Sequence, residues 1–328
     1  MKNYAEIYKN ELLNEVIPFW EKHSLDEEFG GYFTCFTEKG EIYDTDKFIW
    51  LQARQTWMFT ILYQSAQKNM KWKSIALLGS DFLEKYGRDT NGDWYFSLDR
   101  EGQPLVQPYN IFSDCFAAMA FGKLYEIEPK EKYAEIAKTT FESILKRQEN
   151  PKGKYNKVYS GTRNLQNFAL PMILCNLSLE LEPLLGSKRV SEVTDSVIDL
   201  VMNTFYDEKT GLVLENVSNT GEFVDSFEGR LLNPGHAIEA MWFIMNLGIR
   251  KNDTSLIEKA ERVMFQQLEH GWDEEYGGIF YFMDSKGHPP QQLEHDQKLW
   301  WVHLEPLVAL AKTYTYNQNP KAAEWFEK

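Results

Sequence analysis

Apolar residues recur along this chain with two different periods. Val193, Val197 and Val201 are spaced as on one face of a helix, whereas Trp94–Leu98 is a β-prone run followed by the turn formers Glu101 and Gly102. The two patterns alternate, which predicts units made of a helix, a short β-hairpin and a second helix. The predicted helices cover residues 2–22 and 45–67, 70–87 and 110–127, 130–148 and 164–181, 188–205 and 235–250, and 254–270 and 297–315.

The hairpins belong to a repeat. The segment Asp26–Gly31 (DEEFGG) returns as Asp273–Gly278 (DEEYGG), and glycines followed closely by aromatic or apolar residues recur at intervals of 58 to 67 residues. These glycines are Gly31, Gly92, Gly153, Gly211 and Gly278. Self-similarity at a fixed period is typical of ring and solenoid architectures. We therefore predict an all-α fold, an (α/α)6 toroid or barrel with short β-hairpins between its helices.

The C-terminal unit of this ring is expected to be incomplete. Five units have both helices, whereas a sixth begins at Pro320 and stops at Lys328. By the period alone, roughly fifty residues separate this end from a closed ring of six units. The period therefore predicts a chain that continues beyond Lys328.

Composition agrees with one soluble catalytic domain over residues 1–328. No linker rich in Pro, Gly or Ser interrupts the repeat, and the net charge of −14 argues against nucleic acid and anionic membranes as partners. The 10 Trp, 17 Tyr and 21 Phe can fill a large core and also line a cavity for sugar rings. The N-terminus lacks an apolar signal core, and Cys35, Cys115 and Cys175 are widely spaced, which predicts reduced thiols in a cytoplasmic protein.

The sharpest local signal is Asn233–Glu239 (NPGHAIE). Asn233 can cap a helix and Pro234 suits its first position, so His236 lies in the first turn with Glu239 on the same face. A carboxylate beside an imidazole can orient it and raise its pKa, which suits an acid or base catalyst. A structural histidine at a helix end is the alternative interpretation. The motif offers no third or fourth ligand, so we expect no metal.

The repeat also aligns residues of unlike charge. The octapeptide KFIWLQAR, which ends at Arg54, matches KLWWVHLE, which ends at Glu305. Equivalent positions of a closed toroid face one shared centre, so the repeat aims these two charges at the same place. Trp50 and Trp301 lie one helical turn before them, and an aromatic ring beside a charge suits a sugar. Core tryptophans and solvated charges are the alternative interpretation.

A third signal is the segment Gly153–Arg163 (GKYNKVYSGTR). It contains cationic residues and glycines, but it lacks the Gly-Lys-Ser/Thr ending of a phosphate-binding loop. We therefore predict that it forms the third hairpin of the repeat.

Together these motifs resemble those of the N-acylglucosamine 2-epimerase family. The resemblance covers the whole chain and is carried by the QAR-containing helix that ends at Arg54, IFSDCFAAMA at residues 111–120, GKYNKVYSGTR, NPGHAIEAMWF and KLWWVHLE. NPGH together with KLWW is specific to the superfamily. The GKY…GTR segment is more similar to the acylglucosamine epimerases than to cellobiose epimerases or mannose isomerases. The family fold is an (α/α)6 barrel, which agrees with the repeat.

The resemblance implies an isomerase that interconverts N-acetylglucosamine and N-acetylmannosamine through an enolate formed at C2. It places four residues in the active site: His236, Arg54, Glu239 and Glu305. We expect four further residues to bind substrate: Trp50, Trp301, His303 and Asp114. No cofactor is expected to be required, although the family often has ATP as an allosteric activator. The expected partner is a small amino sugar, with a homodimer as the assembly to test.

One departure concerns the second proton donor. In the family a second catalytic histidine lies in the C-terminal segment of the sixth unit, and this chain ends before that segment. His303 matches the tryptophan-rich motif instead. With His236 as one acid–base catalyst and Arg54 at the enolate oxygen, the donor for the opposite face is expected beyond Lys328.

Three alternatives stay open at this point. A mannose-type aldose–ketose isomerase would use His236 and Arg54 to move the proton from C2 to C1. A non-catalytic sugar-binding protein would need only Trp50 and Trp301. An (α/α)6 glycoside hydrolase would need two opposed carboxylates, for which Glu239 and Glu305 could be proposed. The product, whether epimer, ketose, hydrolysed sugar or none, separates these activities.

Overall fold

The computed structural model describes residues 3–159 and 161–328. The chain divides into two compact units, of which the first comprises residues 1–157 and 180–185 and the second residues 158–179 and 186–328. Both consist of helices joined through short strands, and the single domain predicted over residues 1–328 stays a prediction. No helix within the described ranges combines the length and the apolar character needed to cross a membrane.

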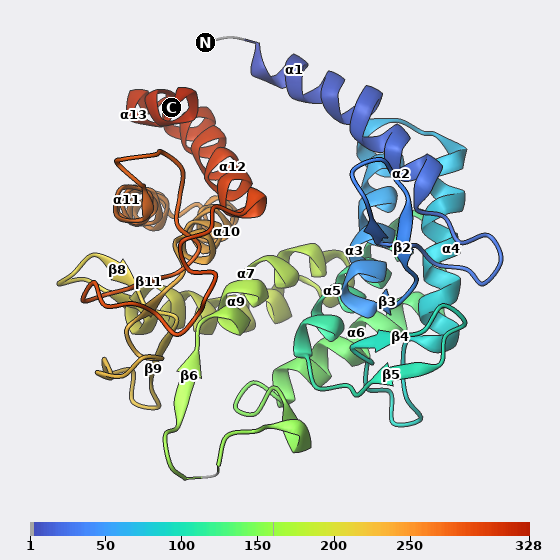
Figure 1. The fold of residues 1–328 in the computed structure, drawn as a ribbon, viewed down its shortest axis with the longest axis horizontal. Coiled ribbons are helices and arrows are strands. Elements are labelled where there is room, and N and C mark those ends of the chain that lie inside the picture. Colours follow the sequence, from blue (N-terminus) through green and yellow to red (C-terminus); the bar gives the residue numbers. More distant parts are fainter. Residues whose placement is uncertain (1–2, 160) are drawn as a thin grey trace. The chain divides into compact units, whose positions relative to one another are not determined.

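The first unit contains four packed helices that matter most for the site. Helix α3 packs against α4 and α5, and α5 packs against α6 (Figure 1). The elements of this unit are α1 (Tyr4–Glu11), η1 (Leu12–Val16), α2 (Ile17–His23), β1 (Cys35–Phe36), β2 (Ile42–Asp44), β3 (Lys47–Phe48), α3 (Ile49–Ile61), η2 (Leu62–Ala66), α4 (Met70–Tyr86), β4 (Ser97–Leu98), β5 (Pro104–Val106), α5 (Ile111–Ile127), α6 (Glu131–Lys146), η3 (Gly153–Tyr155) and α8 (Glu182–Leu185).

The second unit repeats this arrangement. Helix α10 packs against α11 and α12, and α12 packs against α13 (Figure 1). Its elements are β6 (Leu165–Asn167), α7 (Ala169–Glu180), α9 (Ser187–Asp199), η4 (Leu200–Phe205), β7 (Tyr206–Asp207), β8 (Leu212–Val213), β9 (Asn216–Ser218), β10 (Leu231–Leu232), α10 (Pro234–Lys251), α11 (Thr254–Gly271), β11 (Met283–Asp284), α12 (Trp300–Asn317) and α13 (Pro320–Glu327). η1, η2 and η4 are π-helical segments, and η3 is a 3₁₀ turn.

Short antiparallel strands fix where two of the inner helices begin. β3 pairs with β4 directly before α3, with Lys47 opposite Leu98. β10 pairs with β11 just before α10, with Leu232 opposite Met283. Each strand therefore ties the start of its helix to the hairpin of the next repeat, which positions the residues of the first helical turn.

The repeat glycines confirm the turns predicted at their positions. All five have a positive φ, from 53° at Gly153 to 88° at Gly92. The predicted helices are also confirmed, with most boundaries shifted by a few residues. Lys2, in the first predicted helix, lies outside the described residues.

Two predictions in the third repeat are wrong. Residues 153–163 form no hairpin in the part that the structure describes: Gly153–Tyr155 is a 3₁₀ turn, and Val158 and Tyr159 are 58% and 81% exposed. The next strand, β6, pairs instead with β9, which follows it by about fifty residues. Since β6 occupies the start of the helix predicted over residues 164–181, that helix begins only at Ala169. Ser160 lies outside the described residues.

Candidate active site

The start of α10 depends on the three residues that precede the catalytic candidate His236. The Asn233 side chain accepts a hydrogen bond from the backbone N–H of His236 at 3.0 Å, and Pro234 occupies the first helical position, as predicted. A Cβ added to Gly235 would lie 2.9 Å from the ring of Trp301 on α12. Only glycine therefore lets the two helices approach closely enough to bring His236 and Trp301 together.

The His236 imidazole lies between a carboxylate and an aromatic wall. Its Nδ1 is 3.0 Å from Oε1 of Glu215, which belongs to the segment between β8 and β9. Its ring is 5.5 Å from the Trp301 ring, centroid to centroid, at 35° between planes. Tyr281 meets the same indole edge-on at 5.8 Å. The His236 side chain is 27% exposed, so part of it can meet a ligand.

Carboxylates control the charge of this imidazole. Burial lowers the pKa of His236, but the charge of Glu215 and its hydrogen bond raise it, and Glu239 and Glu305 raise it further, with a net rise above the usual value. A histidine shifted upward in this way is a stronger base and titrates closer to neutral pH. Three carboxylates from three elements therefore act on one acid–base group.

Glu305 is held on α12 by a bond to the neighbouring helix. The indole Nε1 of Trp242 on α10 donates to Glu305 Oε2 at 2.8 Å. Glu239 lies one turn after His236 on α10. The second unit thus brings together four of the predicted residues: His236, Glu239, Trp301 and Glu305.

Arg54 lies on an aromatic platform in the first unit. Its guanidinium is 4.8 Å from the ring centre of Phe116 on α5 and 5.8 Å from that of Trp50 on α3. The residue is exposed, and no carboxylate within the described residues of this unit forms an ion pair with it. Stacking on two rings holds a cation in place without neutralising it. Arg54 can therefore stabilise an anionic group of a ligand or a negative charge that develops during a reaction.

Asp114, which was predicted to bind substrate, is paired within the protein. Its carboxylate is 4% exposed and ion-paired with Arg147, and burial raises its pKa to about 7 although Arg147 opposes that rise. A carboxylate enclosed in this way joins α5 to the end of α6. The geometry does not support the substrate-binding role predicted for Asp114.

His303 is also engaged by the protein itself. Its Nε2 accepts the backbone N–H of Ile279 at 3.0 Å, and its Nδ1 lies 2.7 Å from the carbonyl oxygen of Leu299. These contacts fit the neutral tautomer with the proton on Nδ1. Because both ring nitrogens have backbone partners, the geometry does not support the substrate-binding role predicted for His303.

Three residues around His236 were missed from the sequence. Glu215 and Tyr281 contact members of the site but belong to none of the motifs, whereas Trp242 lies within NPGHAIEAMWF but was not chosen as a site residue. Trp242 could have been found, because it lies three residues after Glu239 and therefore on the same face of the helix. Nothing in the local sequence marks Glu215. Nowhere in the described part of the chain do three or more potential metal ligands come together.

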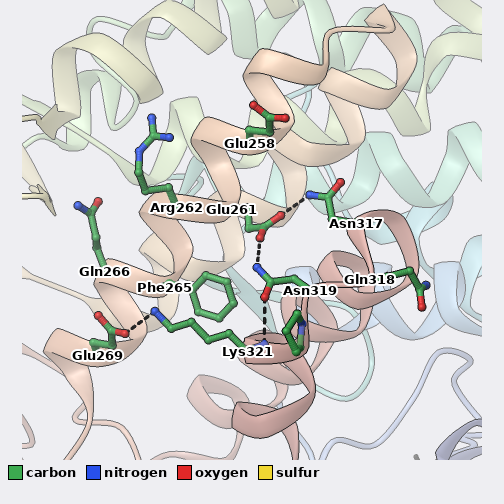
Figure 2. A pocket seen from close by; sticks show the side chains of 11 residues that line it. Glu258, Glu261, Arg262, Phe265, Gln266, Glu269, Asn317, Gln318, Asn319 and Lys321 are labelled. Atoms are coloured by element: carbon green, nitrogen blue, oxygen red, sulfur yellow. Dashed lines mark hydrogen bonds and ion pairs between the residues drawn. The ribbon is translucent and has the colours of Figure 1, made fainter.

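A separate pocket lies between α11 and the turn that joins α12 to α13 (Figure 2). Figure 2 shows Glu261 receiving hydrogen bonds from Asn317 and Asn319, and Glu269 paired with Lys321. None of the candidate residues lines it. These bonds join the start of α13 and the turn before it to α11, so we interpret the pocket as the junction of these helices.

Comparison with known proteins gives matches over nearly the whole chain. The family model described as N-acylglucosamine 2-epimerase (GlcNAc 2-epimerase) matches residues 31–328. The N-acylglucosamine 2-epimerase of Mus musculus is 34% identical over 325 residues, which are 96% of this chain and 77% of the relative.

Solved structures agree in fold. The cellobiose 2-epimerase of Bacillus thermoamylovorans B4167 superposes with a TM-score of 0.85 at 19% identity, over 100% of this chain and 86% of that one. A D-mannose isomerase gives 0.80 at 16% identity, over 99% and 84%. At such identities the likeness shows the fold alone. The predicted fold class, an (α/α)6 barrel with short hairpins, is thereby confirmed.

Proposed function

The chain belongs to the N-acylglucosamine 2-epimerase family and is a sugar 2-epimerase, and we propose that it interconverts N-acetylglucosamine and N-acetylmannosamine. The observation that carries this proposal is the His236 imidazole on the NPGH helix, paired with a carboxylate and facing the Trp301 ring. An acid–base group beside an aromatic wall suits proton transfer on a bound sugar.

The chemistry needs a base, a group that stabilises the enolate, and an acid. In the open-chain sugar the C2 proton is acidic because it lies next to the aldehyde carbonyl. We assign its removal to His236, a step to which a positioned base contributes about 10²–10⁴-fold. We assign Arg54 to the enolate oxygen, because its guanidinium is stacked on rings and no carboxylate among the described residues of its own unit pairs with it. Return of a proton to the opposite face of C2 yields the epimer.

The remaining residues are assigned by what they contact. Trp50 and Trp301 offer ring faces to the sugar, whereas Glu239 and Glu305 act on the charge of His236. This set requires no cofactor for the proton transfers. We also propose that the protein is a cytoplasmic homodimer, that ATP is its allosteric effector and that it binds no nucleic acid.

The test is product analysis in deuterated water. The purified protein is incubated with N-acetylmannosamine, with and without ATP, and followed by ¹H NMR. We expect N-acetylglucosamine that carries deuterium at C2. A parallel incubation contains mannose in place of the amino sugar. Conversion of mannose to fructose, with no epimerisation of N-acetylmannosamine, would contradict the proposal in favour of an aldose–ketose isomerase. Binding without exchange or conversion would indicate a sugar-binding protein.

A further inference from the structure

Glu215 is an acidic side chain enclosed beside the catalytic candidate. Its side chain is 7% exposed, and its one charged neighbour at hydrogen-bond distance in the described chain is His236, at 3.0 Å. A buried carboxylate is costly unless a strong donor or a cation compensates its lost hydration. The imidazole N–H of His236 is such a donor, so the two groups stabilise each other.

The backbone of Glu215 is fixed from three directions. Its N–H donates to the carbonyl of Leu231 at 3.0 Å, and its carbonyl accepts from the N–H of Phe168 at 2.9 Å and from the side chain of Asn167 at 3.2 Å. These partners belong to β10, to the start of α7 and to β6. The carboxylate is therefore carried by a rigid junction of strands, as a group that orients a catalyst should be.

We propose that Glu215 is a positioning residue: its carboxylate accepts a hydrogen bond from Nδ1–H of His236 and so leaves Nε2, on the far side of the ring, as the base that meets the substrate. This inference rests on the proposed function. A carboxylate in this place selects the tautomer, fixes the ring and stabilises the imidazolium formed when the C2 proton is taken. No side chain other than His236 needs to change its protonation for this role.

Other ionisable groups also face His236 and must be separated from Glu215. They are Glu239 on its own helix, Glu305 on α12, and Tyr281 across the Trp301 ring. Glu215 acts on His236 most strongly of the carboxylates, through both charge and a hydrogen bond, whereas Glu239 and Glu305 act through charge alone. Removing the charge of Glu215 should therefore lower the pKa of His236 while the other two groups stay in place.

The central variant is Glu215→Gln, which keeps the shape and an acceptor oxygen but removes the charge. We expect kcat to fall on the order of 10-fold or more, with a smaller change in KM. The acid limb of the kcat/KM profile should move to lower pH, because His236 then loses its proton more readily. Glu222→Gln is the matched control. Glu222 is exposed and follows β9, the strand that begins directly after Glu215, so this variant should change neither kcat nor the acid limb.

A second measurement does not depend on activity. In ¹⁵N–¹H NMR titrations, with the His236 signals assigned by comparison with His236→Asn, the parent should show the Nδ1-protonated tautomer. Glu215→Gln should lower the His236 midpoint by on the order of one pH unit, while His270 on α11 should not move. If the parent shows the Nε2-protonated tautomer, or if the midpoint and the acid limb both stay in place, the role of Glu215 is overturned.

The two proposals fail in different ways. A protein that epimerises amino sugars but shows no shift in Glu215→Gln contradicts only the positioning role. A protein with the predicted tautomer and titration shift, but with no epimer formed by the parent, contradicts only the proposed reaction. Should Glu215→Gln not fold, the tautomer of the parent decides by itself.

Discussion

The first and last hairpins of the repeat share one hydrogen bond, which different residues make in the two copies. In the first, Oε1 of Gln52 accepts the N–H of Tyr32 at 2.8 Å, and Nε2 of the same amide donates back to the Tyr32 carbonyl. In the last, the His303 imidazole accepts the N–H of Ile279 at 3.0 Å. The amide of Gln52 and the imidazole of His303 thus have the same task, which is to hold the backbone just after the paired glycines against the following inner helix. We call Gln52 the first clamp and His303 the second clamp.

The lysines at equivalent positions differ much more. Lys47 is fully buried and donates to Asp26, to the Gly30 carbonyl and to the Arg100 carbonyl. Lys298 pairs with Asp273 but is 27% exposed. The same pair is therefore enclosed in the first copy and partly solvated in the last, which should change its contribution to stability.

The side chains two residues after Gln52 and His303 carry charges of opposite sign. Arg54 follows Gln52 and Glu305 follows His303, and a step of two residues turns a side chain by about 200° around a helix. One side of each inner helix therefore holds the hairpin, while the opposite side offers the charge. The two copies therefore share the hydrogen bond that holds the hairpin backbone, whereas they differ in the charged side chain on the opposite side of the inner helix, where we propose that substrate binds.

The largest expected effect is the loss of turnover in His236→Asn. A general base contributes about 10²–10⁴-fold, and kcat for epimerisation should fall by that factor while the fold stays intact. Epimer formation by NMR and far-UV circular dichroism measure the two properties. His288→Asn, at an exposed histidine, is the control. Turnover within about threefold of the parent would exclude His236 as the base.

The lysine comparison predicts a large difference in stability. Lys47→Met leaves the buried Asp26 with Arg100 as its charged partner, and should cost about 3–5 kcal/mol in the free energy of unfolding. Lys298→Met removes a partly solvated pair and should cost about 1 kcal/mol. Urea denaturation of both variants measures the difference. Equal costs would show that burial does not distinguish the two copies.

Arg54→Ala tests the charge on the opposite side of the first clamp. If the guanidinium stabilises the enolate, kcat should fall by about 10²-fold or more, with a smaller change in KM. Arg54→Lys keeps the charge but loses the planar stacking on Trp50 and Phe116, so its kcat should lie between those of the parent and Arg54→Ala. A change confined to KM would mean that Arg54 binds substrate without acting on the transition state.

Much of the fold could be predicted because its signals are local. The cap at Asn233, the turns at the repeat glycines and the spacing of apolar residues in the helices each depend on a few neighbouring residues. The pairing of β6 with β9 could not be predicted, because its partners are separated by about fifty residues and each strand has only three. Val158 and Tyr159 are typical of a strand in composition, but they are exposed and belong to no strand.

The candidate site shows the same division. His236, Glu239, Trp301 and Glu305 could be chosen because a motif or the repeat marked each of them. The partnership of His236 with Glu215 could not, because it joins a helix to a strand junction 21 residues earlier without any periodic relation. His303 and Asp114 were assigned from motifs alone, but in the structure backbone groups engage the ring of His303 and Arg147 pairs with Asp114.

The smallest expected effect comes from exchanging the two clamps. His303→Gln should cost less than about 1 kcal/mol, because a glutamine can accept the Ile279 N–H as Gln52 accepts that of Tyr32. His303→Leu leaves this buried N–H without a partner and should cost about 1–3 kcal/mol, seen as a lower urea midpoint, with kcat changed only a few-fold. If His303→Leu instead kept its stability and lost its turnover, the clamp would be the wrong explanation. The imidazole would then act on the substrate, as the motif alone had suggested.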